Sequence, residues 1–255
     1  NRSIMPPWPG NKLDISLIAK SRLIADSIKS IDIPILEVGP GKGVLSGFLK
    51  ERFTEFKAIE LDLESVEYLK NEKILSSEQI VFADFLKVDF TEYFDKQFIV
   101  AGNFPYNIST QIVFKILDNK ETVPEMVGMF QKEVAHRIAS PHGSKQYGIM
   151  SVITQAYYNT EVLFDVPPES FYPAPKVIST IIQLTRKSEL PDVDFLKLKR
   201  VVKGAFSQRR KTLRNALRSS GLEISDLTDV LLAKRAEQLK VQQFIDLTNQ
   251  LFPTK

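Results

Sequence analysis

Short β-rich runs alternate with longer helical patterns through the first half of this 255-residue sequence, and this alternation constrains the fold more than any other feature. Five runs predict strands, at residues 35–38, 57–61, 79–83, 98–101 and 126–130. The segments between them are long enough for the crossover helices that join parallel strands. We therefore expect an α/β fold, in which an open and mostly parallel sheet carries helices on both faces.

The pattern changes after residue 139. Residues 161–166 and 180–184 predict two further strands, and the proline-rich segment 167–175 separates them. Two strands joined by a loop can form an antiparallel edge on the same sheet. The pattern is helical from Asp194 to the end. We place a domain boundary at Lys187, which predicts a sheet domain over residues 1–187 and a small all-helical domain over residues 188–255.

The net charge of +3 is unevenly distributed along the chain. Residues 1–186 carry 20 basic and 23 acidic side chains, a net charge of −3, whereas residues 187–255 carry 14 and 8, a net charge of +6. Residues 195–222 contain nine Lys or Arg and no acidic residue. This asymmetry indicates a polyanionic partner for the C-terminal part. A solvated helix face would explain the basic run equally well.

Several classes of chemistry and location are disfavoured. The chain has no cysteine, which excludes disulfides, thiolate zinc sites and a cysteine nucleophile. Its only histidines, His136 and His142, are a poor basis for a metal site, so we expect no metal. With no apolar run near the roughly 18 residues that span a membrane, and no signal pattern, we expect a cytoplasmic protein without membrane contact. We also expect a monomer.

A glycine-rich turn, Glu37-Val38-Gly39-Pro40-Gly41-Lys42-Gly43, follows the first predicted strand and opens a helix. Glycines allow backbone amides to approach a ligand closely, and a helix N-terminus favours anions. The G-x-G-x-G spacing differs from the G-x-G-x-x-G of dinucleotide binding, and Lys42 is followed by Gly rather than by the Ser or Thr of a P-loop. A purely structural turn remains an alternative.

Carboxylates close the next two predicted strands. Glu60, 21 residues after Gly39, could accept hydrogen bonds from both hydroxyls of a ribose. Asp84 could accept from an adenine amino group while Phe85 lines the adenine ring. Either carboxylate alone could be a solvated strand end or a loop cap. Because the carboxyl ends of parallel strands meet at one edge, the three segments together predict an adenosine-bearing cofactor.

Asn103-Phe104-Pro105-Tyr106 follows the fourth predicted strand and is the most informative segment. The exocyclic amino group of adenine is a poor nucleophile, because its lone pair is delocalised into the ring. The Asn103 side-chain oxygen and the Phe104 carbonyl could hold its two hydrogens, while Pro105 stiffens the turn. Tyr106 could stack on an extruded base. The segment indicates methylation of adenine N6, and an ordinary proline turn is the alternative.

Together these segments resemble the KsgA family of small-subunit rRNA adenine dimethyltransferases, from about residue 21 to residue 251. The resemblance implies a Rossmann-like methyltransferase sheet and S-adenosylmethionine as cofactor. The cofactor-binding residues that it implies are Glu37, Gly39, Gly41, Glu60, Leu61, Asp84, Phe85 and Asn103. The catalytic residues that it implies are Asn103, Phe104, Pro105, Tyr106 and Phe171. The RNA-binding residues that we expect are Lys176, Lys203, Arg209, Arg210, Lys211 and Arg214.

The substrate that the resemblance implies is a pair of adjacent adenosines in the 3′-terminal hairpin loop of small-subunit rRNA, in immature subunits. The sequence departs from the family where a G-Q-x-F-L segment normally precedes the first helix, because the corresponding positions read Ser16-Leu17-Ile18-Ala19. Two alternatives stay open: an enzyme of the related Erm class that acts on large-subunit rRNA, and a small-subunit assembly factor without catalysis. A dinucleotide oxidoreductase has the wrong glycine spacing.

Overall fold

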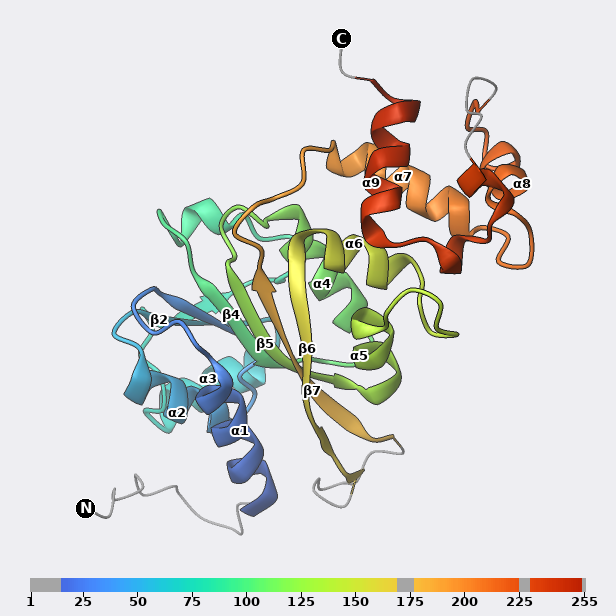
Figure 1. Cartoon of the computed structure of the whole chain (residues 1–255). Helices are drawn as coiled ribbons and strands as arrows, with labels where there is room; N and C mark the ends of the chain where they lie inside the picture. The colour runs from blue at the N-terminus through green and yellow to red at the C-terminus, as the bar shows by residue number, and fades with distance from the viewer. Residues whose placement is uncertain (1–14, 169–176, 225–229, 254–255) are drawn as a thin grey trace.

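One seven-stranded sheet organises the molecule, in the order β3-β2-β1-β4-β5-β7-β6 (Figure 1). The computed structural model describes residues 15–168, 177–224 and 230–253. Its strands are β1 (Ile35–Val38), β2 (Phe56–Glu60), β3 (Ile80–Phe82), β4 (Ile99–Asn103), β5 (Glu125–Gln131), β6 (Tyr158–Val166) and β7 (Ser179–Arg186). Strands β1 to β5 are parallel, while β7 runs antiparallel to both β5 and β6. The predicted α/β fold and its antiparallel edge are confirmed.

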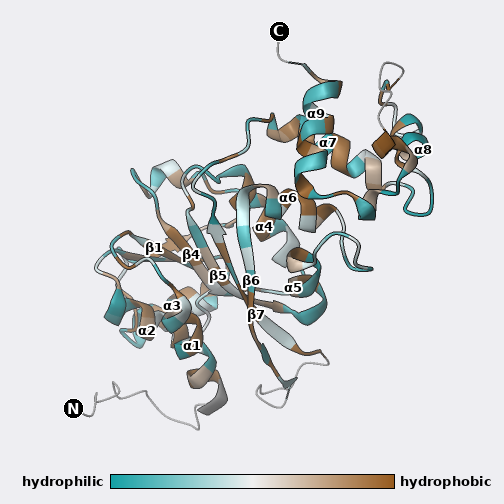
Figure 2. Cartoon of the chain, viewed as in Figure 1, coloured by the Kyte–Doolittle hydropathy of each residue, from teal (hydrophilic) through white to brown (hydrophobic). Residues whose placement is uncertain are grey.

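Helices cover both faces of the sheet. They are α1 (Ile15–Ser27), α2 (Val44–Arg52) and α3 (Leu63–Asn71) on one face, and α4 (Ser109–Asp118), α5 (Lys132–Ala139) and α6 (Ile149–Tyr157) on the other. Strand β4 shows why two layers form, because side chains alternate across a strand. Ile99 and Ala101 belong to the core beneath α1 and α2, whereas Val100 belongs to the core beneath α4 to α6. In Figure 2 the central strands β1 and β4 are coloured mainly as hydrophobic, whereas the edge strand β6 is paler and partly hydrophilic.

The C-terminal helices are α7 (Phe195–Phe206), α8 (Leu213–Ser219) and α9 (Val241–Leu251), with short 3-10 turns at Val230–Ala233 and Ala236–Gln238. Asp194 begins α7 as its N-cap, with its carboxylate accepting a hydrogen bond from the Lys197 amide at 2.8 Å. Helices α7 and α9 pack against α6, at the opposite end of the molecule from α1 (Figure 1). Buried residues of these helices, such as Leu198, share one hydrophobic core with the α4–α6 face of the sheet.

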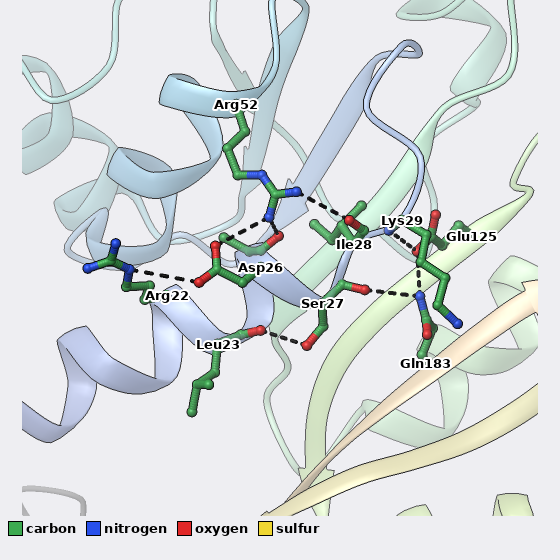
Figure 3. Close-up of polar contacts among 10 residues, drawn as sticks. Arg22, Leu23, Asp26, Ser27, Ile28, Lys29, Arg52, Glu125 and Gln183 are labelled. Atoms are coloured by element: carbon green, nitrogen blue, oxygen red, sulfur yellow. Dashed lines mark hydrogen bonds and ion pairs between the residues drawn. The ribbon is translucent and has the colours of Figure 1, made fainter. Parts of the chain in front are cut away.

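Helix α1 is held at its C-terminal end by polar groups from both α2 and the sheet (Figure 3). The Arg52 guanidinium donates to the carbonyls of Ala25 and, at 3.3 Å, of Ile28. The buried carboxylate of Glu125 in β5 accepts from the amides of residues 29 and 30 at 2.9 and 3.0 Å, and from Gln183 at 2.6 Å. These contacts satisfy backbone groups that a helix end leaves unpaired, and they fix α1 to the sheet.

Helix α1 also contains residues 16–19, so the positions that correspond to the family's segment before the first helix are helical in this chain. The helix pattern extends to them because 15–27 contains neither proline nor glycine. Throughout the described ranges, no helix has the length and apolarity needed to cross a membrane.

Candidate active site

The carboxyl ends of β1, β2 and β4 bring the predicted site residues to one edge of the sheet. The chain order reverses between β1 and β4, and such a switch point is where open α/β sheets bind ligands. Gly39 follows β1, while Glu60 and Asn103 are the last residues of β2 and β4. The Ala83 amide donates to the Glu60 carbonyl at 3.1 Å, which brings the neighbouring Asp84 to the same edge.

The glycine turn combines an open side with a packed side. Gly39, Gly41 and Gly43 have φ angles of 68°, 52° and 75°, which side chains other than glycine rarely adopt. A Cβ at Gly39 or Gly41 would meet no atom within 4 Å, whereas a Cβ at Gly43 would lie 2.6 Å from the Ile74 side chain. The first two glycines therefore leave backbone accessible to a ligand, as a cofactor cradle requires, and the third allows α2 to pack.

Glu60 connects the glycine turn with the end of β2. One carboxylate oxygen lies 3.3 Å from the Gly41 amide, and the other accepts from the amides of Leu61 and Asp62 at 2.9 and 3.0 Å. Leu61 contributes this amide while its side chain is 63% exposed. Asp62 accepts from the Ser65 amide at 2.8 Å as the N-cap of α3. Glu60 thus presents a partly exposed carboxylate beside the open glycines.

Glu37 lies beneath the turn and is only 1% exposed. The Ser46 hydroxyl of α2 donates to its carboxyl group at 2.5 Å. Burial raises the pKa of Glu37 to about 8, and the nearby Glu60 charge adds to this effect. Glu37 therefore keeps its proton at neutral pH in the protein alone. Its expected role at the cofactor stays a prediction.

Asp84 and Phe85 lie just after β3, where both side chains also have partners within the protein, and their expected roles at the cofactor stay predictions. The Asp84 carboxylate accepts from the Leu86 amide at 3.0 Å and pairs with Lys87 at 3.4 Å, so it caps the loop after β3. The Phe85 ring is 4% exposed and lies 5.4 Å from the Phe90 ring, centroid to centroid. The Phe85 ring is therefore a core side chain, which leaves little of its surface for an adenine, because apolar packing from residues 88–98 covers it.

The turn after β4 presents two free acceptors. Asn103 is exposed, and neither its side-chain amide nor the Phe104 carbonyl has a hydrogen-bond partner among the described residues. The Pro105 carbonyl accepts from the Ile108 amide at 3.2 Å, which closes the turn. The Tyr106 hydroxyl lies 2.5 Å from the Ser179 hydroxyl at the start of β7. The turn is thus fixed at both ends while its acceptors remain available.

A slot formed by two glycines receives the Phe104 side chain. Gly102 and Gly128 are register partners on β4 and β5. A Cβ on Gly102 would lie 2.7 Å from the Phe104 ring, and a Cβ on Gly128 would lie 2.1 Å from it. The ring is 1% exposed and packs edge-on against Phe130. These two glycines were not among the predicted site residues, although glycine inside a strand is itself a sign of a close approach.

The expected RNA-binding residues divide into two groups. Lys203, Arg210 and Lys211 are exposed and Arg214 is half-buried, and none of these side chains has a hydrogen bond or ion pair within the described part of the chain. Arg209 differs, because its guanidinium donates to the carbonyls of residues 145 and 147. Its expected phosphate contact therefore competes with an internal role. Phe171 and Lys176 lie outside the described residues.

The sheet order, the glycine turn and the Asn103 turn define a Rossmann-like methyltransferase. Two solved structures share the fold: a dimethyladenosine transferase from Plasmodium falciparum (TM-score 0.75, 22% identity, 91% of this chain and 93% of that one) and the 23S rRNA methyltransferase ErmE (TM-score 0.64, 23% identity, 89% and 97%). The model of the ribosomal RNA adenine dimethylase family matches residues 18–252. The chain belongs to this family.

Sequence relatives agree with that assignment. A protein of Cytophaga hutchinsonii is 49% identical over 222 residues, covering 85% of each chain, and one of Bacteroides fragilis is 48% identical over 232 residues, covering 89% of this chain and 85% of its own. Both carry the name ribosomal RNA small subunit methyltransferase A. The predicted family and the predicted enzyme class are confirmed.

Proposed function

We propose that this protein transfers methyl groups from S-adenosylmethionine to N6 of two adjacent adenosines in the 3′-terminal hairpin loop of small-subunit rRNA. The observation that carries the proposal is the pair of free acceptors, Asn103 and Phe104, beside the open glycine turn. The names of the relatives support the small subunit as the substrate. We place the reaction in the cytoplasm, on immature subunits, with the enzyme acting as a monomer.

The residues at the sheet edge fit S-adenosylmethionine, which supplies an electrophilic methyl group when bound. Gly39 and Gly41 leave room for a ligand to approach the backbone, and the Glu60 carboxylate can accept from ribose hydroxyls. Leu61 and Asp84 complete the proposed cofactor site. Glu37 supports the turn from below through Ser46.

Asn103 and Phe104 would hold the adenine amino group through its two hydrogens. This arrangement favours pyramidal nitrogen, which frees the lone pair for attack on the methyl carbon. Pro105 limits the motion of the acceptors, and Tyr106 offers its ring for stacking on the extruded base, a contact typically worth roughly 1–3 kcal/mol. No general base is required before transfer, because the amino proton becomes acidic once the nitrogen is methylated.

We assign RNA binding mainly to the helical unit over residues 188–255. The cations without internal partners, Lys203, Arg210, Lys211 and Arg214, are suited to phosphate contacts, which position an RNA without reading its sequence. The extruded adenosine is then selected at the Asn103 turn.

Transfer of radiolabelled methyl groups to small subunits that lack adenine dimethylation tests the proposal. We expect incorporation to approach four methyl groups per small subunit, with none on large subunits. Asn103→Ala should lower the rate by about 100-fold or more, the effect typical of removing one group that binds a transition state, with unchanged RNA binding. Asn159→Ala, an exposed asparagine in β6, is the matched control.

Three outcomes would contradict parts of this proposal. Label on large subunits instead would assign the Erm-class activity. Small-subunit binding without label would assign an assembly factor. Loss of RNA binding in a folded Asn103→Ala protein would remove the role given to Asn103.

A further inference from the structure

The loop over residues 141–148 joins α5 to α6 and is held by the C-terminal helices at two places. The Gly143 amide donates to the Glu237 carbonyl at 2.6 Å. The Arg209 guanidinium, in the turn between α7 and α8, donates to the carbonyl of Lys145 and, at 3.4 Å, to that of Tyr147. A loop of the sheet domain therefore takes its position from residues more than 60 positions further along the chain.

Arg209 is well suited to this positioning role. Both bonds come from one nitrogen, Nη2, whose two hydrogens point in fixed directions in the plane of the guanidinium, so that this atom can bind two carbonyls at once. A lysine at the same position would keep the charge but would present a single compact ammonium group. The internal bonds of Arg209 therefore depend on the shape of the guanidinium as well as on its charge.

The side chain of Lys145 remains exposed and has no hydrogen bond or ion pair in the described portion of the structure. It lies on a hollow of 630 Å³ that Arg137, Phe206 and Arg209 also line. Glu133 reaches the same hollow, but the Arg137 guanidinium pairs with its carboxylate at 2.6 Å. The hollow thus has an excess of positive charge and adjoins the exposed cations of residues 210 and 211.

We propose that the 141–148 loop and the basic turn at 209–211 form one surface for RNA phosphates, in which Lys145 contacts phosphate and Arg209 positions Lys145. The inference rests on the proposed RNA substrate. Helix α5 connects this surface with the catalytic edge, because it begins directly after β5. Its eight residues extend about 12 Å, a distance that a few nucleotides of RNA can span.

Binding of small subunits at several salt concentrations, with conservative and truncating variants, tests this surface. Lys145→Ala removes one phosphate contact, so the affinity of the variant should depend less on salt than that of the wild type. The ratio of wild-type affinity to variant affinity should therefore fall about threefold when salt is raised from about 50 to about 200 mM. Arg209→Lys keeps the positive charge but loses the planar guanidinium with its fixed donor directions. We therefore expect it to weaken RNA binding as Arg209→Ala does. Arg218→Lys, the matched control at an exposed arginine of α8 that has no assigned role, should remain close to the wild type.

Combination of the two changes completes the test. If Arg209 acts through Lys145, Lys145→Ala combined with Arg209→Lys should bind no more weakly than Lys145→Ala alone. An unchanged salt dependence in Lys145→Ala, or wild-type affinity in Arg209→Lys, would overturn the proposal. Methyl transfer by the wild-type enzyme is scored separately, so failure of the proposed activity is distinguishable from failure of the surface. Melting curves establish that each variant is folded.

Discussion

At the scale of single residues, burial decides what a motif carboxylate does. Glu37 lies one residue before the end of β1 and Glu60 ends the neighbouring β2, yet Glu37 is buried against Ser46 and Glu60 is partly exposed beside Gly41. Burial therefore raises the pKa of Glu37, which retains its proton at neutral pH. A carboxyl group that is neutral in the protein alone supports the glycine turn without repelling the Glu60 carboxylate.

This burial predicts a specific dependence of stability on pH. The folded protein binds the Glu37 proton more tightly than the unfolded chain, with a pKa of about 8 against 4.5. The free energy of unfolding should therefore fall as pH rises from 4.5 to about 8, and level off above that range. Glu37→Gln keeps an acceptor for Ser46 and should flatten this fall. Urea unfolding measured across that pH range checks this prediction. Glu51→Gln, at an exposed glutamate on α2, is the control. If the free energy of unfolding falls with pH at the same slope in the wild type and in Glu37→Gln, the prediction is wrong.

The sequence predicted residue types at the site better than it predicted their partners. Asn103, Glu60 and the glycines lie at the sheet edge as expected, because strand ends in a parallel sheet converge whatever the detailed packing. The contacts of Arg209 and Tyr106 could not be predicted, because their partners lie 64 and 73 positions away and depend on how the loops fold back. The core position of Phe85 likewise depends on Phe90, which belongs to the next turn.

At the scale of elements, the turn that carries Asn103 is connected to the antiparallel edge of the sheet. The hydrogen bond between Tyr106 and Ser179 joins the turn after β4 to β7, which lies two strands away. Ser179 is fully buried, so that its hydroxyl offers Tyr106 a fixed partner rather than water. The orientation of the Tyr106 ring therefore depends on β7, two strands away from the strand that carries the turn.

Breaking this connection should lower turnover more than substrate binding. Tyr106→Phe and Ser179→Ala each remove one hydroxyl, and loss of about 1 kcal/mol of hydrogen bonding corresponds to about a fivefold lower kcat. If the hydroxyls act only on each other, the double variant should be no slower than either single one. Methyl-transfer kinetics measure kcat and KM separately. Additive losses, or a change confined to KM, would show that the hydroxyls act independently.

Element boundaries differ from the sequence prediction for local reasons. The predicted strand at 161–166 begins three residues earlier, at Tyr158, because α6 ends at Tyr157 and continues into β6 without a loop. Both tyrosines are almost fully buried, so no polar residue marks the change. Strand β1 matches its prediction residue for residue, since Pro34 and Gly39 bound a fully buried run. Clear boundaries therefore depend on turn residues.

At the scale of the whole molecule, the basic helices are continuous with the enzyme core. Leu198 and Val202 of α7 belong to the same buried cluster as Val100 and Phe130 of the sheet. The boundary that we propose near Lys187 thus separates the two proposed functions, methyl transfer and RNA binding. It does not separate two independent hydrophobic cores, which is a condition for autonomous domains.

A shared core predicts a single unfolding transition. Leu198→Ala should destabilise the entire protein by about 2–5 kcal/mol, the usual cost of truncating a buried leucine. Leu196→Ala, on the same helix but 71% exposed, should change stability by less than about 0.5 kcal/mol. Calorimetry should give one peak for both variants, with equal calorimetric and van't Hoff enthalpies. A separate, earlier transition in Leu198→Ala would instead show that the C-terminal helices unfold independently.

The slot beneath the catalytic turn has a consequence for how such enzymes can evolve. Because the Phe104 ring fills the space where Cβ atoms on Gly102 and Gly128 would lie, these three positions cannot drift separately. A side chain gained at either glycine would displace the ring and the turn that carries Asn103. At Gly128, exchange of Phe104 for a smaller residue must come first to make room, whereas at Gly102 the Val38 carbonyl would still lie 2.7 Å from an added Cβ. The permitted order of substitutions is therefore fixed by packing, and a lineage that has accepted alanine at position 128 cannot simply regain phenylalanine at position 104.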